Sequence, residues 1–456
     1  MKKSIWEKLF SAPAEALEKG IETGRKFEQD MENERPVKAV SKYWKTLGPG
    51  LTSGAADDDP SGIATYSQIG ASQGLGLVWL SLFTYPLLGF VQEMCARIGL
   101  ATGLGLAANI KKYYSKKILY LCTVLLLFAN VLNIGADLGA MAKASQLILP
   151  ALPFAFLVFL FAIFSLTLQI FISYKKYAKY LKYLTFVLFA YVISVFFVEV
   201  DWLSVFRHTV IPNFHFSKEV IILLCAALGT TISPYLFFWQ SSQEVEEQIL
   251  HGENTEEKRR AGTTNEDIKN MRIDVWSGMF VSNIIMFFII IASASTLFAN
   301  GITNITSASD AALALRPFAG DFAFTLFALG IIGTGLLAIP VLAGSASYAI
   351  SESFGWKTGL FRKLKQATAF YGVIIIAMIL GITLNFVGLD PIKVLIYSAV
   401  LNGIISPIMI FFIVHLSGDE NIMGNFKNKK AGNVFGWMTF ILVSLVSVIT
   451  LVSFLI

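Results

Sequence analysis

The chain has 456 residues, of which 55% are hydrophobic and only 15% are charged, and it contains 38 phenylalanines. Soluble proteins do not carry so many long apolar runs, so this composition predicts an all-α polytopic membrane protein. The net charge of +5 does not indicate a nucleic-acid partner, because the basic residues gather in the loops between apolar spans.

Residues 1–46 are polar and rich in Lys and Glu, and we expect a cytoplasmic N-terminal tail there. About eleven apolar spans follow, each long enough to be a transmembrane helix across a hydrocarbon core of roughly 30 Å. The spans cover approximately residues 48–70, 76–102, 118–147, 151–172, 180–199, 219–245, 273–299, 322–351, 367–388, 391–416 and 433–456.

Basic residues alternate between the two sets of loops that join these spans. One set, near residues 111–117, 175–182, 258–272, 357–365 and 427–430, holds twenty Lys and Arg residues, and the other set holds only Arg207, Lys218, Arg316 and Lys393. Because cytoplasmic loops carry the excess of Lys and Arg, this pattern predicts a cytoplasmic N-terminus and an external C-terminus. The expected location is the plasma membrane, with the lipid bilayer as the surrounding medium.

The first span is interrupted by Asp57-Asp58-Asp59-Pro60-Ser61-Gly62. Three carboxylates, a proline and a glycine are costly in lipid unless they line a cavity and hold a charged group, so we predict a binding site at this break. Asp59, directly before the proline, is the first-choice ligand. Asp57 and Asp58 are expected either to face an aqueous vestibule or to start the break. The structural alternative is a Pro-kinked helix that an Asp caps.

The sixth span has a similar interruption, Gly229-Thr230-Thr231-Ile232-Ser233-Pro234-Tyr235. Interrupted helices at positions one and six predict an inverted repeat of five plus five helices that holds its solute at the midplane between the breaks. Repeat 1 then covers residues 47–200, repeat 2 covers residues 218–416, and a peripheral eleventh helix covers residues 433–456.

Freed backbone carbonyls and the C-terminal ends of half-helices at such breaks carry partial negative charge, which favours binding of a cation. Beside Asp59, we expect Thr230, Ser233 and the carbonyl of Ala56 to supply oxygen atoms to a hard cation.

Further polar residues lie inside the predicted spans. Asp137, in the third span, is a functional candidate because an intramembrane carboxylate is costly, although a structural partner elsewhere in the bundle explains it equally well. Asn402, in the tenth span, is expected either to serve the site or to bond to a neighbouring helix. Glu93 and Arg97 are four residues apart and predict an intrahelical ion pair.

Gly48-Pro49-Gly50 followed by Asp59-Pro60-Ser61-Gly62 resembles the first helix of the NRAMP (natural resistance-associated macrophage protein) metal transporters, whose break reads Asp-Pro-Gly-Asn. The stretch from Gln92 to Gly103 also looks like that family, and the resemblance covers roughly residues 45–415. It implies the leucine-transporter-type fold, with unwound helices 1 and 6, and import of divalent transition metals, usually with protons.

Two departures from the family pattern concern the choice of metal. Gly62 stands where the resemblance implies a metal-binding Asn, and Ser233-Pro234-Tyr235 stands where the family has Met-Pro-His. A thioether favours soft transition metals and a hydroxyl does not, so the loss of Met predicts hard ions such as Mg²⁺ or Mn²⁺.

Other departures concern protons. Asn130 and Asn133 stand where the family's third helix has two carboxylates, and Tyr235 replaces a His that titrates near neutral pH. These replacements predict weak or absent proton coupling.

The sequence therefore predicts an alternating-access transporter whose partner is the transported divalent ion, with no resident cofactor and no obligate protein partner. An alternative keeps the fold but moves a small organic solute, with Tyr235, Phe237, Phe238 and Trp239 as an aromatic wall. An enzyme is not expected, because the chain has no HExxH motif, P-loop or histidine cluster.

Overall fold

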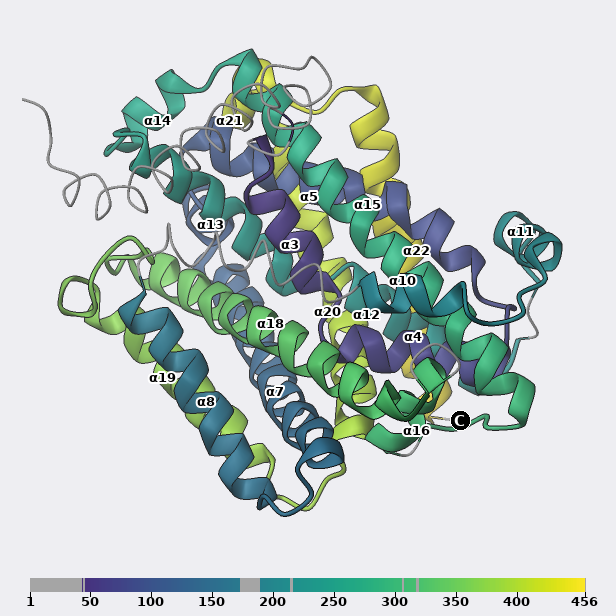
Figure 1. The fold of residues 1–456 in the computed structure, drawn as a ribbon. Coiled ribbons are helices and arrows are strands. Elements are labelled where there is room, and N and C mark those ends of the chain that lie inside the picture. The colour runs from purple at the N-terminus through teal and green to yellow at the C-terminus, as the bar shows by residue number, and fades with distance from the viewer. Residues whose placement is uncertain are drawn as a thin grey trace, which may run out of the picture. The chain divides into compact units, whose positions relative to one another are not determined.

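The computed structural model describes residues 43, 46–172, 189–213, 216–305, 307–316 and 320–455. Within these ranges the regular elements are α-helices and short 3-10 helices, with no strand among them. Almost all of the predicted tail and part of the predicted fifth span lie outside the described residues. Each of the other ten predicted spans holds at least one helix (Figure 1).

The helices carry the labels of Figure 1. Their bounds are α3 Pro49–Asp57, α4 Pro60–Gln73, α5 Trp79–Thr102, α6 Leu106–Tyr113, α7 Lys116–Ile148, α8 Phe154–Phe171, α10 Phe189–Val195, α11 Trp202–Val210, α12 Lys218–Thr231, α13 Pro234–Leu250, α14 Glu256–Gly262, α15 Asn265–Thr296, α16 Ala308–Ala312, α18 Ala323–Phe354, α19 Thr368–Leu384, α20 Pro391–Gly418, α21 Glu420–Met423 and α22 Lys430–Leu455.

Seven stretches of the described residues are long and apolar enough to cross a bilayer. They are Lys116–Ile148, Phe154–Phe171, Lys218–Leu250, Asn265–Asn300, Ala323–Phe354, Pro391–Gly418 and Lys430–Leu455. Large apolar side chains on α8, among them Phe156, Ile163 and Phe164, face outward from the protein. Such a surface requires lipid around it, so the protein is integral to a membrane.

Both predicted interruptions are confirmed, and each has the same local cause. The first break separates α3 from α4 at Asp58 and Asp59, and the second separates α12 from α13 at Ile232 and Ser233. Each second half begins with proline, which tolerates the first helical position because it needs no N–H there. The residue before a proline avoids the helical region, and Asp59 (φ −68°, ψ 174°) and Ser233 (φ −82°, ψ 131°) are accordingly extended.

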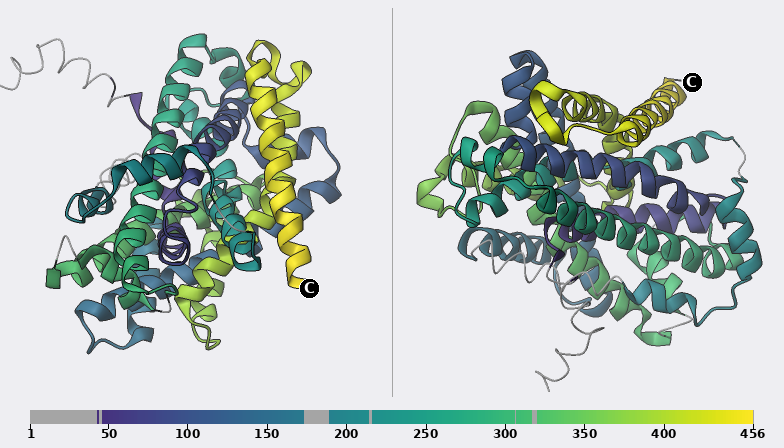
Figure 2. Two further views of the ribbon diagram at one scale, coloured as in Figure 1. Left: turned by 90° about the vertical axis from the view of Figure 1, so that its right-hand side faces the viewer. Right: turned by 90° about the horizontal axis from the view of Figure 1, so that it is seen from above.

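The four half-helices of the two breaks lie inside the bundle. α3 and α4 pack on α15, α12 packs on α20, and α13 packs on α5 and α18. α8 lies beside α19 at one edge in Figure 1, and α22, yellow in Figure 2, packs on α20, α12 and α5. The polar breaks are therefore enclosed by protein rather than exposed to lipid, as the physics of a bilayer requires.

α3 approaches α15 backbone to backbone. A Cβ atom at Gly54 would lie 2.2 Å from the carbonyl oxygen of Gly278, and one at Gly278 would lie 2.1 Å from the carbonyl oxygen of Gly50. Small residues let membrane helices come this close, so these glycines set the distance between the two helices.

Gly54→Ala is expected to lower the melting temperature of the purified protein clearly, because the added methyl group meets backbone that cannot swing aside. Overpacking of this kind costs about 1–3 kcal/mol. The matched control is Gly372→Ala in α19, where an added Cβ meets nothing within 4 Å and should change the melting temperature little. Equal melting temperatures for the two variants would contradict the close approach of α3 and α15.

Candidate functional site

Asp59 lies between the two halves of the first interrupted helix and is 1% exposed. Its Oδ1 accepts hydrogen bonds from Ser61 Oγ at 2.5 Å and from the backbone N–H of Gly62 at 2.8 Å. Its Oδ2 accepts a hydrogen bond at 2.7 Å from Nδ2 of Asn133, a residue of α7. These donors fix the carboxylate as the N-cap of α4. Oδ1 already accepts two bonds, whereas Oδ2 accepts one and keeps a further lone pair for a cation.

The second break meets the first through hydroxyl groups. Thr230 Oγ1 lies 3.3 Å from Ser61 Oγ, and a Cβ atom at Gly62 would lie 3.3 Å from the same Thr230 oxygen. Ser233 Oγ donates to the carbonyl oxygens of Gly229 at 2.7 Å and Thr230 at 2.8 Å, so its proton is used within its own segment and its lone pairs remain. The structure thus brings together oxygen atoms from both breaks.

Carbonyls at the breaks already accept hydrogen bonds. Tyr235 donates its hydroxyl to the carbonyl oxygen of Ala56 at 2.7 Å. Ser406 of α20 donates to the carbonyl oxygen of Ile232 at 2.6 Å. Unwinding therefore leaves fewer unoccupied carbonyl lone pairs than the sequence alone suggests.

Asp57 and Asp58 contact a different helix from the ones that Asp59 contacts. Ser282 of α15 donates its hydroxyl to Asp57 Oδ2 at 2.6 Å and lies 3.4 Å from Asp58 Oδ1. Both Asp side chains are fully buried, so the expectation that they face an aqueous vestibule does not describe this conformation. Their partner was missed because nothing in the sequence indicates which residue of another helix faces the break.

Asn133 and Asn130 have separate surroundings. Asn133 joins Asp59 to α20, because its Oδ1 accepts a bond from Ser398 Oγ at 2.8 Å. Asn130 Nδ2 instead donates to Leu342 O and Ser345 Oγ of α18, both at 2.8 Å. Of the two residues, only Asn133 has a hydrogen bond to Asp59 among the described contacts.

Asp137 and Asn402 are buried and have orphaned side-chain oxygens. Both carboxylate oxygens of Asp137 and Oδ1 of Asn402 lack a hydrogen-bond partner within the described part of the chain. Lys143 does not neutralise Asp137 through any described ion pair, and its ammonium lies 5.3 Å from the centre of the Phe154 ring. The structure does not join Asp137 or Asn402 to Asp59 by a described hydrogen bond.

The start of α3 is held by a residue that sequence reasoning missed. Asp274 of α15 accepts three backbone hydrogen bonds, from Gly48 at 2.8 Å, Gly50 at 2.6 Å and Leu51 at 3.0 Å. Further along α3, Ser53 Oγ donates to Gln240 Oε1 of α13 at 2.6 Å. These contacts close the bundle on the α3 side of Asp59.

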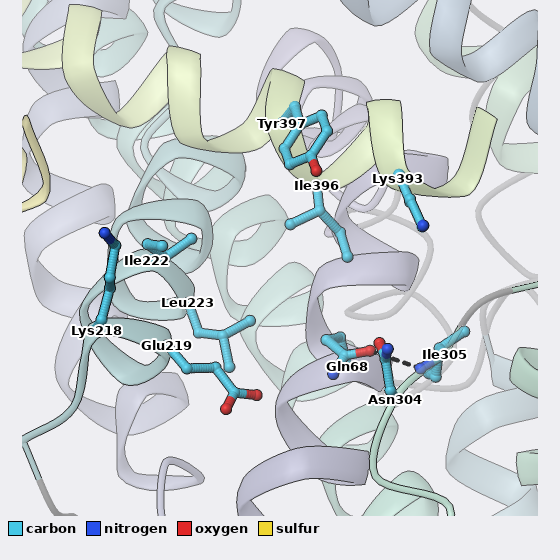
Figure 3. A pocket seen from close by; sticks show the side chains of 10 residues that line it. All are labelled: Gln68, Lys218, Glu219, Ile222, Leu223, Asn304, Ile305, Lys393, Ile396 and Tyr397. Atoms are coloured by element: carbon cyan, nitrogen blue, oxygen red, sulfur yellow. Dashed lines mark hydrogen bonds between the residues drawn. The ribbon is translucent and has the colours of Figure 1, made fainter. Parts of the chain in front are cut away.

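A hollow of about 550 Å³ lies on the other side of the break, between α4, α12, α20 and the segment before α16. Figure 3 shows Lys393, Ile396 and Tyr397 of α20 on one wall and Glu219 of α12 opposite. Gln68 of α4 fastens the loop at its edge, since its Nε2 donates to Thr303 O at 3.1 Å and its Oε1 accepts from Ile305 N at 2.8 Å. Asp59 is buried and is not among the residues that line this hollow, so this conformation encloses the break.

The family model described as "natural resistance-associated macrophage protein-like" matches residues 50–453 of this chain. The chain belongs to the Nramp family. The resemblance found in the sequence is therefore confirmed, and it extends beyond residue 415 into α22.

A curated relative and two solved structures are similar to this Nramp protein. The chain is 26% identical over 435 residues to the "divalent metal cation transporter MntH" of Clostridium acetobutylicum, covering 91% of this chain and 92% of the relative. It superposes on the manganese transporter of Eremococcus coleocola with a TM-score of 0.71 at 20% identity, covering 90% and 87% of the two chains. It also superposes on MHP1, a nucleobase-cation-symport-1 family transporter in a closed conformation, with a TM-score of 0.53 at 13% identity, covering 89% and 90%.

These likenesses confirm the expected fold class, the leucine-transporter-type arrangement with its two unwound helices. The relatives are transporters, which confirms that the chain is a transporter and not an enzyme.

Proposed function

We propose that this Nramp protein is an alternating-access transporter of divalent metal cations that favours hard ions, Mg²⁺ or Mn²⁺, and couples weakly or not at all to protons. One observation carries the proposal. Asp59, the charged residue of the family's metal-binding break, is buried and held by Ser61, Gly62 and Asn133, beside oxygen donors from the second break. The name of the Clostridium acetobutylicum relative supports the class of substrate.

The preference for hard ions rests on the donor atoms that the second break offers. Ser233 stands where the family has a methionine, so the second break offers hydroxyl and carbonyl oxygen in place of a thioether. Mg²⁺ and Mn²⁺ prefer oxygen ligands, and Mg²⁺ gives up its water reluctantly. We therefore take Asp59, Thr230, Ser233, Gly62 and the Ala56 carbonyl as the metal-contacting set, with part of the ion's water shell retained.

Weak proton coupling rests on three replacements, Asn130, Asn133 and Tyr235. Asn133 donates an amide hydrogen to Asp59 where the family has a carboxylate, and an amide does not titrate. Tyr235, in place of a histidine, donates to the Ala56 carbonyl. The membrane potential still drives import, at roughly 2.3 kcal/mol per elementary charge for each 100 mV.

The proposal includes an orientation of the chain in the membrane and a pair of inverted repeats. A cytoplasmic N-terminus and an external C-terminus follow from the distribution of Lys and Arg. The two breaks then belong to inverted repeats at residues 47–200 and 218–416, with α22 outside them.

Mn²⁺ uptake into proteoliposomes, with a pH-sensitive dye inside and Mg²⁺ as competitor, tests the proposal. We expect uptake that Mg²⁺ suppresses and that leaves internal pH unchanged. Uptake that ignores a large excess of Mg²⁺ would contradict the preference for hard ions, and acidification in step with uptake would contradict weak coupling.

Ser233→Cys is expected to shift the preference toward soft metals, because a thiol of nearly the same size replaces the hydroxyl. We expect Cd²⁺ to compete with Mn²⁺ uptake about tenfold more strongly, equivalent to about 1.4 kcal/mol of binding free energy. Ser345→Cys on α18 adds the same thiol beside Asn130 and serves as control. Unchanged competition by Cd²⁺ in Ser233→Cys would remove Ser233 from the metal-contacting set.

The organic-solute alternative gains no support from the aromatic run after the second break. Phe237, Phe238 and Trp239 are buried, and the Trp239 ring packs on Tyr348 of α18 with ring centres 6.3 Å apart. A Cβ atom on Gly344 would lie 2.7 Å from that Trp239 ring. These rings fill the interior of the bundle.

A further inference from the structure

The carboxylates of the first break point in two directions. The hydrogen bonds of Asp59 go to α4 and α7, whereas those of Asp57 and Asp58 go to Ser282 of α15. The backbone explains the divergence, because Asp58, the C-cap of α3, has φ −87° and ψ 50° while Asp59 is extended at ψ 174°. No group of three or more His, Cys, Asp or Glu within the described ranges converges on one point, so the three carboxylates do not form a single cluster.

Asp57 and Asp58 are incompletely satisfied. Both side chains are 0% exposed, and Oδ1 of Asp57 and Oδ2 of Asp58 have no hydrogen-bond partner within the described part of the chain. The ion pairs found there involve Glu93, Glu256 and Glu420, so no described Lys or Arg neutralises either Asp. Buried carboxylates ordinarily have an ion-pair partner or bind a metal, because an unpaired charge costs several kcal/mol in such surroundings.

Ser282 contacts one oxygen of each of these two carboxylates. Its hydroxyl lies 2.6 Å from one Asp57 oxygen and 3.4 Å from one Asp58 oxygen, and Ser282 is itself 1% exposed. The C-terminal end of α3 adds partial negative charge from its last carbonyls at the same place. All the candidate ligand atoms are oxygens, which hard divalent cations prefer. The two negative charges of the carboxylates also equal the charge of one divalent ion.

We infer that Asp57, Asp58 and Ser282 form a second cation site, separate from Asp59, that takes a hard divalent ion on the α15 side of the break. The inference rests on the proposed function, since the same class of ion fills both sites. The second ion lies where α3 meets α15, so it links α3 to the helix that holds its start. Asp58→Asn or Ser282→Ala should weaken this second site and leave the Asp59 site intact.

Mn²⁺ binding to the purified full-length protein, measured by equilibrium dialysis, tests the inference. We expect two Mn²⁺ per chain for the wild type, one for Asp59→Asn and one for the double variant Asp57→Asn/Asp58→Asn. In the electron paramagnetic resonance spectrum, we expect broadening from two neighbouring Mn²⁺ ions in the wild type and its loss in both variants. Size-exclusion chromatography of each variant serves as the control for folding.

Ser282→Ala keeps the test decisive if the double variant does not fold, because it removes only a hydroxyl. We expect it to weaken the second Mn²⁺ about tenfold and to leave the first unchanged. One Mn²⁺ per wild-type chain, retained in the double variant and lost in Asp59→Asn, would overturn the second site while leaving the proposed function in place. One Mn²⁺ that both variants lose would show a single shared site and also overturn it. No Mn²⁺ bound to the wild type would instead contradict the proposed function itself.

Discussion

Asp59→Asn is expected to reduce Mn²⁺ and Mg²⁺ uptake at least about 100-fold while the protein still folds. The amide oxygen of Asn still accepts the Gly62 N–H, so the cap on α4 survives, but the negative charge that a divalent ion needs is gone. A charge-assisted contact worth about 3 kcal/mol corresponds to roughly that factor. Initial uptake rates in proteoliposomes, normalised to reconstituted protein, give the measurement.

Asp390→Asn is the matched control for this variant. Asp390 also precedes a proline and caps a helix, accepting bonds from the backbone N–H groups of Ile392 and Lys393 at the start of α20. It therefore loses the same charge and keeps the same capping role, away from the break. We expect near-normal uptake from Asp390→Asn. Substantial uptake by Asp59→Asn would show that Asp59 serves as a cap and does not bind the transported ion.

Asp274→Ala is expected to release the start of α3 from α15. The Asp274 carboxylate accepts from Gly48, Gly50 and Leu51, and its removal leaves three backbone N–H groups without this acceptor. Breaking a buried hydrogen bond to a charged group costs about 1.5–3 kcal/mol. We therefore expect a clear drop in melting temperature, whereas Asp267→Ala, in the exposed capping box of the same helix, should cost only about 1 kcal/mol.

A second readout separates release of α3 from a general loss of stability. Ser53 is buried and bonded to Gln240, so a cysteine at this position should react slowly with a thiol reagent that does not cross the membrane. We expect Asp274→Ala to speed the labelling of Ser53→Cys several-fold, because α3 moves away from α13 and α15. The native Cys95, Cys122 and Cys225 are buried and provide the background. Equal labelling rates with and without Asp274 would contradict its role in holding α3.

The two breaks could be predicted from the sequence because their causes are local. Pro60 and Pro234 each forbid continuation of the preceding helix, and the polar residues around them need partners that lipid does not offer. Asp59 could be predicted as a candidate ligand for the same reason. The predicted pair of Glu93 and Arg97 is also present at 3.5 Å, although Arg272 of α15 lies closer to Glu93, at 2.9 Å.

The partners of the break could not be predicted, because they lie on other helices. Ser282, Ser398 and Ser406 each donate to a group at or beside a break, yet serines are common in membrane helices and their spacing does not show which helix they face. Asp274 did carry a signal, as a carboxylate at the start of the predicted span 273–299. Its role as a cap for α3 depends on the close approach of α3 and α15, which is a tertiary feature.

Entry of Mg²⁺ itself tests the central claim most directly. Proteoliposomes loaded with a Mg²⁺-sensitive dye, under a membrane potential that is negative inside, should show Mg²⁺ entry with the wild type and none with Asp59→Asn. Liposomes that admit Mn²⁺ but no Mg²⁺ would contradict transport of Mg²⁺, the hardest ion of the proposed set. Liposomes that admit neither ion, with protein that is folded and correctly inserted, would contradict divalent-metal transport as a whole.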